Sequence, residues 1–206
     1  MPPLALEAYR AKPNTMVMSQ TKPNYLKHHF LIAMPHMADP RFVNSLIYLC
    51  DHNEDGAMGL VINQPSDLHL ADILEQLQPA VDLPGKVASF PVYNGGPVQT
   101  ERGFVLHRGP EQWEASMDLG QLQLTTSRDI LLDMAHGIGP SEVLLALGYA
   151  GWDAGQLDQE LAENVWLSCP ADPHILFELP SEERLLAAAR SLGIDLRLLT
   201  SQAGHA

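Results

Sequence analysis

The chain has 206 residues, 46% of them hydrophobic, which is typical of one compact domain. It contains no apolar run of roughly 18 residues, the length that a membrane-spanning helix needs. Its formal net charge is −13 at pH 7, divided into −2 over residues 1–110 (8 Lys and Arg against 10 Asp and Glu) and −11 over residues 111–206 (4 against 15). Because a DNA-binding surface needs clustered cations to neutralise phosphates, this charge argues against direct binding of nucleic acid.

Residues 1–24 are predicted to be a poorly ordered extension, and residues 25–206 a single domain. The extension starts with two prolines and scattered polar residues, without the continuous apolar core and cleavage site of a signal peptide. Both cysteines, Cys50 and Cys169, lie in apolar runs typical of strands. We therefore expect two reduced, buried thiols in a cytoplasmic protein.

The first half of the domain is predicted to contain three strands and a helix. Apolar runs indicate strands over 26–35, 44–53 and 56–65. The dipeptide Asp55-Gly56 predicts a hairpin turn between the last two. Leucine and isoleucine then recur with helical spacing over 68–77, which predicts an amphipathic helix, and residues 80–89 are typical of a linker.

The second half mixes strands and helices. Four strand candidates, with turns typical of an antiparallel meander, occur over 90–96, 103–109, 113–119 and 122–127. A helix over 126–137 ends at Gly137, and the apolar run over 142–151 predicts a strand buried on both faces. The remaining elements are a helix within 153–166, a strand over 164–172, a helix over 181–193, and a closing strand or extended tail over 194–200. Because strands and helices do not strictly alternate, the fold class predicted is α+β, with a sheet packed against helices.

The helix within 153–166 has a predicted start and a predicted orientation. Asp153 and Gln156 resemble a capping box, with Asp153 as the capping side chain. Its leucines share one face, so the acidic residues Asp158, Glu160 and Glu163 are predicted to point away from the core.

Two glycine-rich motifs and one polar strand end are candidates for a site. GYAGW, residues 148–152, does not match a phosphate-binding loop, and acidic residues crowd the helix after it, so we interpret it as a strand, a tight exit and a helix start. Asn94-Gly95-Gly96-Pro97 predicts a turn between strands, with a ligand-binding loop as the alternative. Asn63 ends a strand before Pro65, where an asparagine either caps a turn or faces a cleft.

No catalytic residue is predicted. The nine histidines show no metal-binding spacing with a carboxylate, so neither a metal nor another cofactor is expected. No nucleophile motif of the G-x-S-x-G type occurs. Cys169 and His174 are close in sequence, but this spacing alone does not indicate a dyad, and no cluster of cations surrounds the cysteine to activate its thiol.

Five motifs, in order, resemble those of a known family. They are YLKHHFLIAMPHMADPRF, GAMGLVINQP, YNGGPVQTERGFVLH, LGYAGWDAGQLDQEL and NVWLSCPADPHILFELPSEERLLAAA, and they resemble the bacterial YqgE/AlgH family over roughly residues 25–206. The resemblance implies an α/β sandwich with a bent, partly barrel-like, mainly antiparallel sheet flanked by helices. It also implies a cytoplasmic protein named as a transcriptional regulator of alginate production, with no catalytic residues to carry over. Gln64 stands where the family usually shows a basic residue.

Resemblance and charge together predict a non-enzymatic regulatory or interaction protein that acts on transcription indirectly. We expect a monomer whose shallow cleft, with exposed aromatic side chains beside glycine turns, holds a protein or small-molecule partner. The predicted cleft residues are Asn63, Pro65, Asn94, Gly95, Gly96, Pro97, Tyr149 and Trp152. The alternative is an enzyme of unknown reaction with a pocket at the NGGP and GYAGW motifs. A close Cys–His or His–carboxylate pair with shifted pKa values would favour that alternative.

Overall fold

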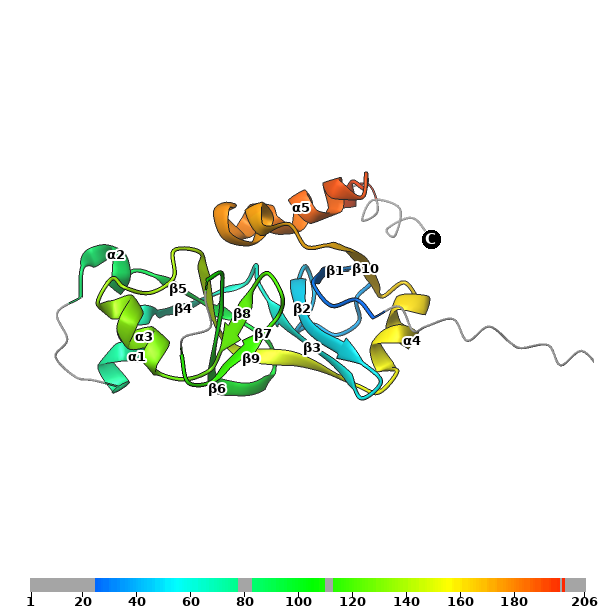
Figure 1. Ribbon diagram of the computed structural model, residues 1–206. Coiled ribbons are helices and arrows are strands. Elements are labelled where there is room, and N and C mark those ends of the chain that lie inside the picture. The colour runs from blue at the N-terminus through cyan, green and yellow to red at the C-terminus, as the bar shows by residue number, and fades with distance from the viewer. Residues whose placement is uncertain (1–24, 78–82, 110–112, 197, 199–206) are drawn as a thin grey trace, which may run out of the picture.

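A single curled sheet is the centre of the molecule. The structure, a computed structural model, describes residues 25–77, 83–109, 113–196 and 198. Ten strands form one sheet that curls into a half-barrel, with helices at both ends and along one side (Figure 1). This arrangement confirms the α+β class and the bent, mainly antiparallel sheet. The predicted extension over residues 1–24 lies outside the described residues.

Eight of the strands follow one another across the sheet, each antiparallel to its neighbours. Their order is β10 (Trp166–Pro170), β1 (His29–Ala33), β2 (Leu46–Asn53), β3 (Gly56–Val61), β9 (Val143–Asp153), β6 (Val98–His107), β8 (Gln123–Thr125) and β7 (Ser116–Asp118). The remaining two strands, β4 (Pro65–His69) and β5 (Pro91–Asn94), pair with each other, and β5 also runs parallel to β9.

The long strand β9 holds both halves of the sheet together. Along one edge it pairs with β5 through residues 145–147 and with β3 through residues 150–153. Along its other edge it pairs with β6. The chain must therefore cross β9 between the end of β5 and the start of β6, and the glycines of both motifs lie at that crossing.

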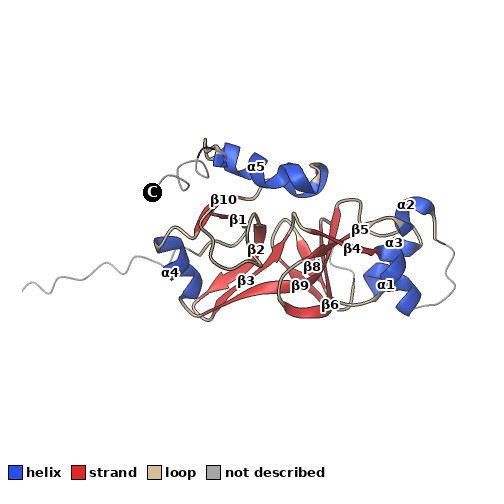
Figure 2. Cartoon of the chain, turned by 180° about the vertical axis from the view of Figure 1, so that it is seen from behind, coloured by secondary structure: helices blue, strands red, loops and turns tan. Residues whose placement is uncertain are grey.

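The helices cover three sides of the sheet. The short helices α1 (Leu70–Leu77), α2 (Gly85–Ala88) and α3 (Asp129–Ala135) gather at one end, and α4 (Gln156–Ala162) lies at the opposite end (Figures 1 and 2). The π-helical turn η1 (His174–Glu178) leads into α5 (Ser181–Ser191), which packs along the sheet near β1. Among the described residues, no helix has both the length and the apolar character needed to cross a membrane.

Three clusters of buried apolar side chains hold these layers together. The largest fills the inner side of the sheet and meets α5, and it contains Phe30, Tyr48 and Leu106. A second lies beside α4 and contains Trp152, Leu157 and Trp166. A third joins α1 and α3 to the sheet through residues such as Leu74, Ile130 and Leu145.

Most predicted elements are confirmed, and five details differ. The strands other than β4, the hairpin at Asp55-Gly56 and the helices α1, α3, α4 and α5 lie where the sequence predicts them, whereas β4 lies where the sequence predicts the end of one strand and the start of a helix. The meander is wrong, because β5 pairs with β4 and β9, and β8 rather than β7 lies beside β6. The linker over 80–89 contains α2, and in the predicted closing strand Leu196 and Leu198 are helical. Helix α4 follows Gly155 and has no capping side chain of Asp153, although the Gln156 side chain accepts the Asp153 backbone N–H at 3.0 Å.

Candidate functional site

The two glycine motifs meet where the chain crosses β9, and their glycines are needed for close backbone contact. The Gly95 N–H donates to the Leu147 carbonyl at 2.8 Å. A Cβ on Gly96 would overlap the Tyr149 carbonyl group, and one on Gly148, which has a φ of +72°, would overlap the Gly96 oxygen. The backbone therefore fills the space that a ligand-binding loop would need here.

The predicted asparagines lie on the same side of the crossing, but their roles differ. The Asn63 amide oxygen accepts the Leu46 N–H at 2.7 Å, and its amide nitrogen donates to the Asn44 carbonyl at 2.9 Å, so Asn63 joins the ends of two strands. Asn94 is exposed at the end of β5, and Pro65 is exposed at the start of β4. None of these three residues lines the groove described next.

Two predicted residues, Pro97 and Trp152, line a groove beside α4 that we call the tryptophan groove. It has a volume of about 460 Å³, within the usual range of ligand sites. Its walls come from the loop over residues 36–42, the start of β6, the end of β9, α4 and the start of β10. Phe42, Val165 and Trp166 belong to its apolar lining.

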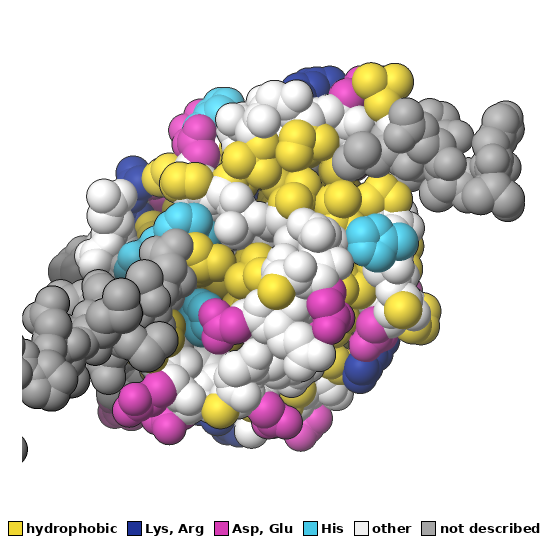
Figure 3. Space-filling view, turned by 90° about the vertical axis from the view of Figure 1, so that its right-hand side faces the viewer, with side chains coloured by type: hydrophobic (Ala, Val, Ile, Leu, Met, Phe, Trp, Pro, Cys, Tyr) yellow, Lys and Arg dark blue, Asp and Glu magenta, His cyan; other side chains and the backbone are white. Residues whose placement is uncertain are grey.

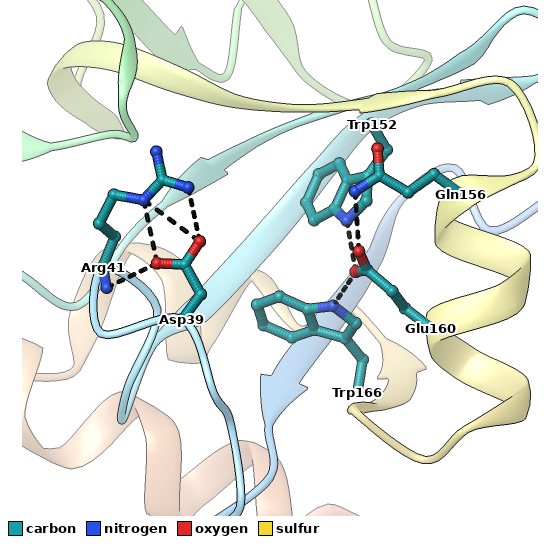
Figure 4. Close-up of polar contacts among 6 residues, drawn as sticks. All are labelled: Asp39, Arg41, Trp152, Gln156, Glu160 and Trp166. Carbon is teal, nitrogen blue, oxygen red and sulfur yellow. Dashed lines mark hydrogen bonds and ion pairs between the residues drawn. The ribbon is translucent and has the colours of Figure 1, made fainter.

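One carboxylate fixes both tryptophans of this groove (Figure 4). Glu160 Oε2 accepts the indole N–H of Trp152 at 2.8 Å and that of Trp166 at 2.7 Å, and Glu160 Oε1 accepts the Gln156 amide N–H at 2.8 Å. The two indole rings meet edge to face with centroids 6.0 Å apart, and Phe42 meets Trp166 in the same way at 5.7 Å. The aromatic wall is thus held by hydrogen bonds as well as by packing.

A charged pair stands at the rim of the groove. Arg41 donates to Asp39 through Nη2 at 2.6 Å and through Nε at 2.9 Å. These side-chain hydrogen bonds lower the pKa of the Asp39 carboxyl and raise the pKa of the Arg41 guanidinium. The pair is exposed to solvent, so it shapes the polarity of the rim and contributes little to stability.

The aromatic side chains of the predicted cleft differ from the expectation. Trp152 is buried, and Tyr149 is half-buried with its ring 5.6 Å from that of Phe104, so the prediction of exposed aromatics is wrong. Glu160 was predicted to point away from the core, and it faces the tryptophans instead. The sequence did contain a signal for this contact, since two tryptophans flank the short helix that carries Glu160.

The molecular end that carries α4 is both apolar and acidic. Figure 3 shows this end, the one on the right in Figure 1, with hydrophobic side chains gathered across its upper half and acidic side chains along its lower rim. A surface of this kind suits contact with apolar groups of a partner and repels polyanions.

Neither thiol is hydrogen-bonded to a histidine among the described residues, and the buried His52 lies with its Nε2 3.6 Å from Asp158 Oδ2. Burial raises the pKa of both the Cys50 and the Cys169 thiol, and both cysteines are free. His174 is exposed and bonds Glu178 at 2.9 Å, away from the buried Cys169. Within the described ranges, no group of three or more His, Cys, Asp and Glu side chains could hold a metal ion.

A separate apolar cavity of about 290 Å³ contains one polar pair. His28 Nδ1 lies 3.1 Å from the Tyr48 hydroxyl, and His28 has a positive φ of 61°. Burial raises the pKa of Tyr48 and lowers that of His28, so both groups are neutral near pH 7. This pair satisfies a buried hydroxyl rather than forming the His–carboxylate pair that would favour an enzyme.

Comparisons with known proteins agree on one family. The AlgH-like family model matches residues 30–197. UPF0301 protein AlgH of Pseudomonas aeruginosa strain PAO1 is 60% identical over 189 residues, which cover 92% of this chain and 100% of that protein. A UPF0301 protein of Stutzerimonas stutzeri has the same identity and coverage.

Solved structures agree with this assignment. The solution structure of AlgH from Pseudomonas aeruginosa is similar with a TM-score of 0.75, covering 92% of this chain and 100% of that chain at 60% identity. The crystal structure of a Corynebacterium diphtheriae protein gives a TM-score of 0.66 at 22% identity, covering 89% and 94% of the two chains, and shows the shared fold alone. Family model, relatives and structures together show that the chain belongs to the AlgH-like (UPF0301) family.

Proposed function

We propose that this protein is a non-enzymatic binding protein whose tryptophan groove receives an apolar segment of a partner protein. The observation that supports this most is the fixing of Trp152 and Trp166 by Glu160. Side chains that are already immobile lose little conformational entropy when a partner docks, so a preformed aromatic wall favours binding. Regulation of transcription, taken from the family resemblance, would then act through that partner. Two free, buried thiols fit a protein of the cytoplasm.

The groove indicates the chemistry of the partner. Its walls are aromatic and apolar, whereas its rim carries the Asp39–Arg41 pair and Gln156. Interfaces commonly place one or two apolar anchor side chains in such a pocket and surround them with polar contacts. A leucine, methionine or aromatic side chain on an otherwise polar segment is therefore the anchor that fits best.

The other two functions find less support. The open space beside the NGGP and GYAGW motifs is the tryptophan groove itself, which Pro97, Gly151 and Trp152 line, whereas Gly96 and Gly148 place backbone against backbone. In the tryptophan groove, all three hydrogen bonds of Glu160 are directed to protein donors, and Asp39 is paired with Arg41. Direct binding to DNA is opposed by a net charge of −13.

The proposal is tested by closing the groove. Ala38 is exposed and lines it, so Ala38→Trp fills the groove from the rim and leaves the core intact. Ala154 is exposed in the turn before α4 and lies outside the lining, so Ala154→Trp is the matched control. The three immobilised proteins are incubated with extract of the source bacterium, and bound proteins are identified by mass spectrometry.

We expect one or more proteins to be retained by wild type and by Ala154→Trp and lost with Ala38→Trp. Circular dichroism confirms that each variant is folded. Retention of the same proteins by all three chains would overturn the proposal. A gel-shift titration of DNA with this protein at low salt checks that any effect on transcription acts through a partner. We expect no shift of the DNA.

A further inference from the structure

A second hollow, which we call the arginine cavity, lies between α1, β6 and the segment that leads into α3. It has a volume of about 450 Å³. The helices α1 and α3, which contribute to its lining, lie at the opposite end of the sheet from α4 (Figure 1). Its inner surface is apolar, with Ile73 from α1, Leu131 from α3, and Leu145 and Leu147 from β9. Polar side chains lie around its mouth, and the two cations among them are Arg102 and Arg128.

Neither of these arginines is neutralised by a carboxylate among the described residues. Arg102 donates to two neutral groups, the Gln99 amide oxygen at 3.2 Å and the Thr126 hydroxyl at 3.3 Å, and its guanidinium lies 5.5 Å from the centre of the Phe104 ring. Arg128 is exposed; its backbone carbonyl accepts the N–H groups of Leu131 and Leu132, whereas its guanidinium makes no hydrogen bond or ion pair within the described part of the chain. The cavity lining contains a single carboxylate, Glu101, so its formal charge is +1 from two arginines and one glutamate.

Three of the six other lysines and arginines in the described residues are paired with carboxylates. Lys27, Arg41 and Arg108 each form an ion pair with a nearby aspartate or glutamate. In a chain with a net charge of −13, two guanidinium groups without such partners at one cavity make a local positive potential within a negative surface. Contacts with Gln99, Thr126 and Phe104 hold Arg102 at the mouth, so this charge is fixed in position.

From this placement we infer that the arginine cavity binds a small organic anion. Its acid group, a carboxylate or a phosphate, lies between Arg102 and Arg128, because a guanidinium donates paired hydrogen bonds to either group. Its apolar body lies on the floor formed by Ile73, Leu131 and Leu147. The site is separate from the tryptophan groove, so it adds a small ligand to the protein partner proposed above.

The first experiment is calorimetric titration of the full chain with octanoate, octyl phosphate and 1-octanol, which share an apolar body and differ in the head group. We expect at least one of the two anions to bind with a Kd below about 1 mM and 1-octanol to bind at least about tenfold more weakly. Comparison of the two anions then distinguishes a carboxylate ligand from a phosphate ligand. Equal binding of 1-octanol, or failure of both anions to bind, would overturn the inference.

The second experiment tests whether Arg128 binds the acid group and whether the apolar floor of the cavity binds the ligand's alkyl chain. Arg128→Gln removes no side-chain hydrogen bond or ion pair of the described residues, so we expect a folded protein that binds the anion at least about tenfold more weakly, with partial recovery in Arg128→Lys. Arg190→Gln, an exposed change on α5 outside the cavity, is the matched control and leaves binding unchanged. From acetate to octanoate the affinity should rise by roughly fourfold for each methylene that becomes buried. Unchanged binding by Arg128→Gln, or equal binding of acetate and octanoate, would contradict the assignment.

Discussion

Glu160 offers the sharpest test of how the tryptophan groove is held. In Glu160→Leu the indole N–H groups of Trp152 and Trp166 lose their common acceptor, and the Gln156 amide loses its acceptor as well. A hydrogen bond to a charged group contributes about 1.5–3 kcal/mol, so two buried indole donors would cost about 3–6 kcal/mol in a dry site. Because the groove admits water, we expect a loss of about 2–4 kcal/mol.

The loss is measured by urea unfolding followed by far-UV circular dichroism. Glu163→Leu is the matched control, because Glu163 is exposed and accepts one bond, from Gln159 at 2.9 Å. This control should lose less than about 0.5 kcal/mol, as exposed substitutions usually do. Equal unfolding free energies for Glu160→Leu and Glu163→Leu would refute the view that Glu160 fixes the aromatic wall.

Three further results are expected. Gly148→Ala should lower the free energy of unfolding in urea by more than about 2 kcal/mol, because a side chain at φ +72° is strained and its Cβ overlaps the Gly96 oxygen. Gly103→Ala, which has open space around the new Cβ, should lower it by less. A soluble thiol reagent at pH 8 should leave Cys50 and Cys169 unmodified until urea is added, because burial raises both thiol pKa values and so lowers the thiolate fraction; rapid reaction of the native protein would contradict this. The urea midpoint should fall as the pH decreases below about 6.5, because burial lowers the pKa of His28 and His107 in the folded state, so that the unfolded chain binds more protons. A midpoint that rises with acidification would show that these histidines do not govern stability in this range.

Local signals in the sequence were sufficient for most individual elements. Asp55-Gly56 between two apolar runs predicted a hairpin because a turn of this kind depends on neighbouring residues alone. Helix α1 follows from the helical spacing of its leucines in the same way. Pairing of strands across the sheet depends on residues that are distant in sequence, and local patterns did not predict which strands pair. Besides β4, β5 pairs with β9, some fifty residues further along, so proximity in sequence wrongly favoured a meander with β6.

In the candidate site, too, local sequence signals were informative and contacts between distant segments were not predicted. The glycine turns beside Pro97 and Trp152 make both of them candidates, and both line the tryptophan groove. Phe42 and Trp166 come from two other segments, and no local pattern brings those segments to Trp152. The spacing of the leucines on one face of the helix predicts that Glu160 points away from the core. The two indole donors, which overturn that prediction, become visible only when the strands on either side of α4 are in place.

The central position of β9 also sets the order in which the protein can fold during synthesis. Gly56 of β3 pairs with Asp153, and Val92 of β5 pairs with Leu145, so both wait for a strand that leaves the ribosome much later. Until then, β3, β5 and β6 expose one edge each, and such edges are prone to aggregation. Folding of this chain is consequently a late event that depends on contacts distant in sequence, and such folds form slowly.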